Sequence, residues 1–275
     1  MPNHSDTYKL RNKIKNSLQN DVDQILQLAK ELSIEEVISY LVKSYPDKVT
    51  CSSSFSFEDQ VITHKILTNQ LPVSIFTLDT GRLFEETYSV WSATNERYHT
   101  KIRGYNPDHK LLEPFVAENG PNSFYESVQQ RKACCYIRKV EPLKRALKNK
   151  CAWITGIRAE QSDDRHDLAQ VEWDEGNQII KYHPLLNWAT EEVKAYVNEH
   201  HIPYNILYDR GYTSIGCAPC TKPVKPGEDT RAAAGGGRII QRRNVGCMYH
   251  VMYEASIQYM LRFFNLADFF IQEKN

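Results

Sequence analysis

The chain has 275 residues, and its 34 lysines and arginines balance 34 aspartates and glutamates, which gives a formal net charge of zero. This balance excludes a nucleic-acid or membrane partner selected by bulk electrostatics, and 41% hydrophobic with 25% charged residues excludes general disorder. No apolar run approaches the ~18 residues that a membrane span needs, and the first twenty residues lack the apolar centre of a secretory signal. We therefore expect a cytoplasmic protein.

The first 45 residues predict two helices. Apolar residues between Ile14 and Leu32 recur at the spacing of one helical face. Ser33 followed by Glu36 forms a capping box, which opens a second helix. We therefore expect residues 1–45 to form a helical N-terminal segment that precedes the first strand.

From residue 46 to about residue 230, strand-like and helical patterns alternate. The expected strands are residues 49–51, 73–78 and 152–155, and the expected helices are residues 58–69, 85–98, 131–148 and 190–200. Pro142 is expected to interrupt the third helix, and Thr190 is expected to cap the fourth. The alternation predicts an α/β fold, a doubly wound and mostly parallel sheet with helices on both faces.

Ligands of such sheets bind beyond the carboxyl ends of the strands. Three predicted loops lie there, at residues 52–59, 79–82 and 156–165. Further along, the alanines and glycines of residues 232–237 can form no core and are expected to be mobile. Residues 253–272 predict a final amphipathic helix for docking or for a homo-oligomer, because its charges argue against a membrane anchor.

Seven cysteines in a long chain without a secretory signal favour metal or catalytic thiols over disulfides. Cys134 and Cys135 are adjacent, and Cys217 and Cys220 enclose two residues. Each pair alone has a simpler explanation: two small buried residues for the first, and a zinc half-site or redox pair for the second. Because zinc sites rarely use adjacent cysteines, the four thiols together favour an iron–sulfur cluster over zinc.

Six stretches occur in the order expected for one enzyme family. They read SSSFSFED at 52–59, LDTGR at 78–82, CCYIRKVEPL at 134–143, TGIRAEQS at 155–162, PYN at 203–205 and GYTSIGCAPCT at 211–221. From about residue 49 to residue 230 the chain resembles the assimilatory adenylyl-sulfate (APS) reductases, the iron–sulfur branch of the APS/PAPS (sulfonucleotide) reductase family. The resemblance implies an adenine-nucleotide α-hydrolase fold, a 4Fe-4S cluster, and reduction of adenylyl sulfate to sulfite and AMP by thioredoxin.

The resemblance also assigns roles to individual residues of a nucleotide- and cluster-binding core, residues 46–230. The implied cluster ligands are Cys134, Cys135, Cys217 and Cys220, and Lys139 couples the cluster electrostatically to the substrate. The implied substrate-binding residues are Ser53, Ser54, Ser56, Asp59, Leu78, Arg82, Arg158, Arg165, Arg231 and Arg238. Hydroxyl and N–H groups of the first loop suit anionic oxygens, and arginines can fork onto phosphate or sulfate.

A catalytic thiol is expected near the C-terminus. Cys51 and Cys151 have apolar neighbours and are expected to be core residues. The resemblance implies that Cys247 is the nucleophile, with His250 and nearby arginines favouring its thiolate. In this mechanism the thiolate attacks the sulfate sulfur, AMP leaves, and an external dithiol releases sulfite from the resulting S-sulfocysteine. Residues 231–275 would then form a mobile catalytic segment followed by the final helix.

Two alternatives stay open at this point. The phosphoadenylyl-sulfate branch of the family lacks the cluster cysteines, but use of both nucleotides is compatible with this sequence. The other alternative is a metal-stabilised nucleotide-binding protein without reductase activity, because the segment before Cys247 lacks the consecutive tryptophans of the family. Release of sulfite from each nucleotide would distinguish these interpretations.

Overall fold

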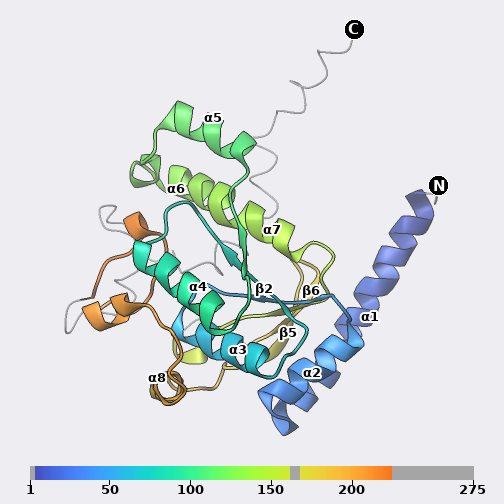
Figure 1. Cartoon of the computed structure of the whole chain (residues 1–275). Helices are drawn as coiled ribbons and strands as arrows, with labels where there is room; N and C mark the ends of the chain where they lie inside the picture. Colours follow the sequence, from blue (N-terminus) through green and yellow to red (C-terminus); the bar gives the residue numbers. More distant parts are fainter. Residues whose placement is uncertain (1–3, 162–167, 225–275) are drawn as a thin grey trace.

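The computed structural model describes residues 4–161 and 168–224, with side chains from residue 17 onward. Its strands are β1 (Val49–Ser52), β2 (Ser74–Leu78), β3 (Arg103–Tyr105), β4 (Ala152–Ile154), β5 (Val171–Asp174) and β6 (Ile179–Tyr182). They form one sheet (Figure 1), and the strand order is β3-β2-β1-β4-β6-β5. Neighbouring strands are parallel, except that β5 pairs with β6 antiparallel. The predicted doubly wound, mostly parallel α/β sheet is confirmed.

Helices precede and connect these strands. They are α1 (His4–Glu31), α2 (Ile34–Ser44), α3 (Phe57–Thr68), α4 (Glu85–Arg97), α5 (His109–Asn119), α6 (Val128–Cys135), α7 (Glu141–Leu147) and α8 (Thr190–Glu199). Short helical turns are η1 (Ser123–Tyr125), η2 (Tyr136–Val140), η3 (Ala159–Gln161), η5 (Ile206–Arg210) and η6 (Ala218–Cys220). The two predicted N-terminal helices are confirmed, and α1 packs against β5 and β6 (Figure 1).

Strand residues alternate between the two faces of the sheet, and each face has its own core. On β4, Ala152 and Ile154 join the larger core, whereas Trp153 joins the smaller one. The larger core also contains buried residues of α2, α3 and α8. Leu143 and Leu147 of α7 cover the opposite face. Burial on both faces explains why the central strands are apolar with little alternation.

The predicted helix at 131–148 is three consecutive segments. After α6 ends at Cys135, the π-helical turn η2 follows, and α7 begins at Glu141. Pro142 lies in the first turn of α7, where its missing N–H breaks no helical hydrogen bond. The predicted interruption is therefore confirmed, and a π turn just before the proline produces it.

The predicted cap at Thr190 is wrong. Ala189 is the N-cap of α8, and Thr190 is the first helical residue. Its hydroxyl is instead 2.8 Å from Glu160 Oε2, a partner that lies thirty residues earlier in the chain. Strand β3, helix α5 and the β5–β6 hairpin have no counterpart in the sequence prediction. The run at 232–237 and the helix at 253–272 lie outside the described residues. None of the helices that the structure describes is both long and apolar enough to cross a membrane.

Candidate functional site

The loop between β1 and α3 is built around one buried carboxylate. Asp59 is 5% exposed, and its Oδ2 accepts hydrogen bonds from the N–H and the hydroxyl of Ser54, both at 2.7 Å. Ser56 is the N-cap of α3, and its hydroxyl accepts from the Asp59 N–H at 3.2 Å. The buried Ser53 donates its N–H to the Phe76 carbonyl at 2.8 Å. Four predicted substrate-binding residues thus form one connected turn at the carboxyl end of β1.

The chain reverses in this loop at Phe55. Its backbone is left-handed, with φ of 60°, and its ring is buried and stacks on Trp91 with the ring centroids 5.8 Å apart. The next residue, Ser56, has a φ of −66°, which any L residue adopts, so this position of the loop does not need a glycine. Packing of the Phe55 ring stabilises this left-handed backbone conformation, which L residues adopt only at a cost in free energy.

The loop after β4 lies directly against the same turn. A Cβ on Gly156 would be 2.4 Å from Asp59 Oδ1 and 3.0 Å from the Glu58 Cβ, so only glycine permits this approach. Burial raises the pKa of Asp59 to about 6; the charge of Glu58 adds to this shift, and the hydrogen bonds from Ser54 oppose it. The β1 and β4 loops therefore pack directly against each other at the carboxyl edge of the sheet.

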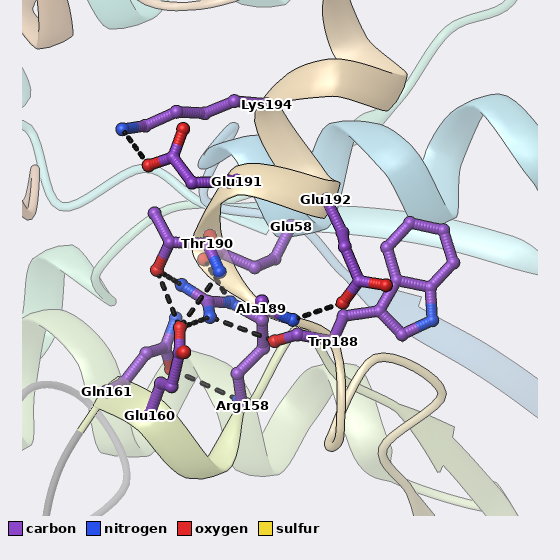
Figure 2. Close-up of polar contacts among 10 residues, drawn as sticks. All are labelled: Glu58, Arg158, Glu160, Gln161, Trp188, Ala189, Thr190, Glu191, Glu192 and Lys194. Atoms are coloured by element: carbon purple, nitrogen blue, oxygen red, sulfur yellow. Dashed lines mark hydrogen bonds and ion pairs between the residues drawn. The ribbon is translucent and has the colours of Figure 1, made fainter.

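Arg158, which was expected to bind the substrate anion, is surrounded by protein partners (Figure 2). Its Nε donates to Glu58 Oε1 at 2.8 Å, and its Nη1 donates to Glu160 Oε2 at 2.9 Å. Nη1 also reaches the Trp188 carbonyl at 3.1 Å, and Nη2 reaches the Thr190 hydroxyl at 2.9 Å. The side chain is only 5% exposed. Every guanidinium nitrogen thus has a protein partner in this structure.

The β2 loop supplies two further predicted residues. Leu78 ends the strand with its side chain in the smaller core. Arg82 is half-buried and turns toward the segment that precedes η1, where its Nη1 is 3.2 Å from Asn122 Oδ1 and its Nη2 donates to the Pro121 carbonyl. Its guanidinium carbon lies 5.0 Å from the centroid of the Phe124 ring. Arg82 therefore joins the β2 loop to residues 121–124.

The same loop also contacts the second cysteine pair. Thr80 Oγ1 lies 3.2 Å from Cys217 Sγ, and the Ala218 N–H donates to the Arg82 carbonyl at 2.8 Å. Arg138 donates from Nη1 to the Thr80 carbonyl at 2.7 Å. Its buried Nε has no hydrogen-bond partner among the described residues. These contacts bring the π turn, the β2 loop and the second cysteine pair together.

The four predicted cluster cysteines share one environment. Burial raises the pKa of Cys134, and the charges of Cys135 and Cys217 add to the shift. Burial also raises the pKa of Cys220 to about 11; the charges of the other three thiols add to this shift, whereas Lys139 opposes it. The thiols of two pairs that are 82 residues apart therefore lie within electrostatic reach of one another, and Lys139 lies within the same reach of Cys220.

Cysteine thiolates are the ligand type that an iron–sulfur cluster needs. Across the residues that the structure describes, no three His, Cys, Asp or Glu side chains lie close enough to bind one metal ion. In a 4Fe-4S cluster each cysteine binds a different iron, so the sulfurs stand further apart. The thiolates of these cysteines would repel one another, so a cationic centre that binds them suits the set, and the buried Nε of Arg138 offers an N–H to a sulfur.

Five predicted residues lie outside the described part of the chain. They are Arg165, Arg231, Arg238, Cys247 and His250. Their roles stay predictions.

Sequence reasoning missed several residues that hold the site together. They are Glu58, Thr80, Arg138, Gly156 and His183. The first four lie inside the six motif stretches of the family resemblance, so the motifs contained them, but no role was predicted for these individual residues. His183 is fully buried, and its Nδ1 lies 2.6 Å from the Thr155 hydroxyl. It follows β6 and has no local motif, so only the sheet topology could reveal it.

Comparisons with known proteins agree with this architecture. Residues 48–223 match the family model described as the phosphoadenosine phosphosulfate reductase domain. An adenosine 5'-phosphosulfate reductase of Burkholderia cepacia is 49% identical over 186 residues, 68% of this chain and 74% of that protein. One of Allochromatium vinosum is 44% identical over 203 residues, 74% of this chain and 79% of that protein.

A solved structure gives the same picture. The phosphoadenylyl-sulfate reductase of Candida auris, in its phosphate complex, is 31% identical with a TM-score of 0.63, and the match covers 73% of this chain and 95% of that chain. Both the sequence matches and the six-stranded sheet therefore place the chain in one group: it belongs to the phosphoadenosine phosphosulfate (APS/PAPS) reductase family.

Proposed function

We propose that the chain reduces adenylyl sulfate to sulfite and AMP in cytoplasmic sulfate assimilation, with thioredoxin as the reductant. The observation that carries this proposal is that the two cysteine pairs meet at the β2 loop, where Thr80 contacts Cys217 and accepts from Arg138, three residues after Cys135. The phosphoadenylyl-sulfate branch lacks these cysteines, whereas the two relatives compared above are named adenosine 5'-phosphosulfate reductases. The choice of adenylyl sulfate as the substrate is therefore supported both by the four cysteines and by the similarity to these relatives.

The cluster ligands in this proposal are Cys134, Cys135, Cys217 and Cys220. When bound, a 4Fe-4S cluster supplies electrostatic stabilisation of charge that gathers on the sulfate oxygens. Lys139 would add a positive charge on the same side. Anaerobically purified protein should contain about four irons and four sulfides per chain. Stoichiometric zinc with iron near zero would contradict the assignment.

The remaining site residues bind and orient the nucleotide. The hydroxyls of Ser53 and Ser56, which accept hydrogen bonds within the loop, would donate to the anionic end, while the N–H and hydroxyl of Ser54 hold the Asp59 carboxylate. Arg82 and Arg165 would add positive charge at the ends of their strands, and Arg231 and Arg238 would close over the anion. These groups exclude water and hold the sulfur in line for attack.

The chemical step is a displacement at sulfur. The Cys247 thiolate attacks, a bond forms between Sγ and sulfur, and the bond from sulfur to the phosphate oxygen breaks, so AMP leaves with that electron pair. His250 would favour the thiolate. One thioredoxin thiolate then attacks the Cys247 Sγ and sulfite leaves with the S–S electron pair. The second thioredoxin thiol resolves the mixed disulfide, so thioredoxin ends oxidised.

A substitution at Cys247 tests this step. Protein incubated with adenylyl sulfate but no reductant should gain the mass of one sulfonate on the peptide that contains Cys247. Cys247→Ser should abolish both the adduct and sulfite release, while iron content and AMP affinity stay near the wild-type values. An adduct on Cys51 or Cys151, or turnover by the serine variant, would show that the nucleophile is another residue.

A further inference from the structure

Arg158 joins three parts of the chain that are far apart in sequence. Glu58 belongs to the first turn of α3, Glu160 to η3, and Thr190 to the first turn of α8 (Figure 2). Glu160 Oε2 also accepts from the N–H and the hydroxyl of Thr190, both at 2.8 Å. Arg158 and Glu160 therefore together bind the start of α8, while the Nε of Arg158 binds the start of α3.

The buried half of this network lies next to the predicted anion-binding loop. Glu58 precedes Asp59, which holds the N–H and hydroxyl of Ser54. Gly156 packs against the same turn, two residues before Arg158. The ion pair between Arg158 and Glu58 thus fastens the β4 loop to the β1 loop beside the surface where both loops meet.

Direct binding of a substrate anion by Arg158 would require breaking this pair. The two side chains are 5% and 10% exposed, and removal of one partner from a buried ion pair leaves the other charge without compensation. Glu58 and Glu160 already place two negative charges on the guanidinium. An incoming anion would therefore meet a buried guanidinium that two carboxylates already neutralise, with four of its five N–H groups bonded to protein.

We infer that Arg158 is a positioning residue, which acts through Glu58 to hold the 53–56 loop and Gly156 in the shape that receives the anionic end of the nucleotide. This inference rests on the proposed adenylyl-sulfate site and changes the role expected of Arg158 in it. Arg158 itself does not contact the substrate. Its contribution is made before the nucleotide binds, so it affects binding of substrate and product alike.

A double-mutant cycle tests this role. The variants are Arg158→Met, Glu58→Gln and the two combined, with Arg158→Lys as the conservative change. Dissociation constants for AMP are measured by calorimetry, and kcat and KM are measured for adenylyl sulfate. Each single variant should raise the Kd of AMP and the KM by about 10-fold and change kcat by less than about 2-fold, because uniform binding is lost.

The combined variant should bind AMP no more weakly than Arg158→Met, because both changes remove one interaction. Arg158→Lys, which keeps a charge facing Glu58 but loses the fork to Glu160, should fall between wild type and Arg158→Met. As a matched control, Arg210→Met with Glu86→Gln removes an exposed ion pair and should leave Kd and KM unchanged.

Other results would overturn the inference. If Glu58→Gln leaves AMP affinity unchanged or tightens it while Arg158→Met weakens it, the guanidinium binds the anion directly. Additive losses in the combined variant lead to the same conclusion. If wild-type protein binds AMP and the cycle behaves as expected but no sulfite is released, the proposed reductase function fails and the positioning role stands.

Discussion

At the scale of single residues, Asp59 is the most constrained group of the site. Its carboxylate accepts two hydrogen bonds from Ser54, adjoins Glu58, and lies 2.4 Å from where a Cβ on Gly156 would be. Burial raises the pKa of Asp59 from 3.8 to about 6. The folded chain therefore binds a proton at this carboxyl more tightly than the unfolded chain does.

Because this pKa is raised on folding, Asp59 favours the folded state most below pH 3.8, and that contribution is lost as the pH rises through about 6. We expect the free energy of unfolding of wild type, relative to Asp59→Asn, to fall by on the order of 1 kcal/mol between pH 5 and 7.5. Urea denaturation of both proteins at the two pH values measures the difference. A difference that does not change with pH, or that grows toward pH 7.5, would show that Asp59 is not a raised-pKa acid.

At the scale of elements, the site depends on how closely the loop after β4 approaches the start of α3. Gly156 follows β4 by two residues, and any side chain there would strike the Asp59 carboxylate and backbone N–H. The added Cβ would meet the backbone nitrogen of Asp59 and the Asp59 carboxylate. Because Ser54 holds this carboxylate by two hydrogen bonds, neither group can move away easily. Separation of the two loops would open the surface proposed to bind the anion.

Gly156→Ala should therefore lower the free energy of unfolding by about 1–3 kcal/mol and weaken AMP binding by roughly 10-fold. Thermal melting and calorimetry with AMP measure the two effects. Gly176→Ala is the matched control, since its Cβ would meet only the Asp174 Oδ1 at 3.3 Å, and it should keep AMP affinity. Wild-type affinity in Gly156→Ala would mean that the two loops do not form one binding surface.

At the scale of the whole molecule, the strands nearest the site were predictable because burial on both faces selects short runs of apolar and β-branched residues. β1, β2 and β4 begin or end within two residues of their predicted bounds. Strand β3 was missed because its three residues, Arg103 to Tyr105, are too short and polar for a pattern. The β5–β6 hairpin was missed because it pairs antiparallel at the sheet edge, outside the α/β alternation.

The candidate site was predictable to a similar extent. Motif order identified the loops and the cysteine pairs, since these depend on residue type. It did not identify partners: Arg158 was expected to bind an anion, but Glu58, one hundred residues earlier, occupies its Nε. Thr190 was expected to cap its own helix, and its hydroxyl instead binds Glu160. Such pairings follow from sheet order, which local spacing does not contain.

The measurement that tests the central claim most directly is sulfite release from each sulfonucleotide by anaerobically purified protein, with thioredoxin, its reductase and NADPH. The four converging thiols predict sulfite from adenylyl sulfate, with a kcat/KM at least about 10-fold above that for phosphoadenylyl sulfate. Cys247→Ser serves as the control and should release none. Equal or reversed kcat/KM values, or no sulfite from either nucleotide while the protein binds AMP and contains iron, would contradict the account.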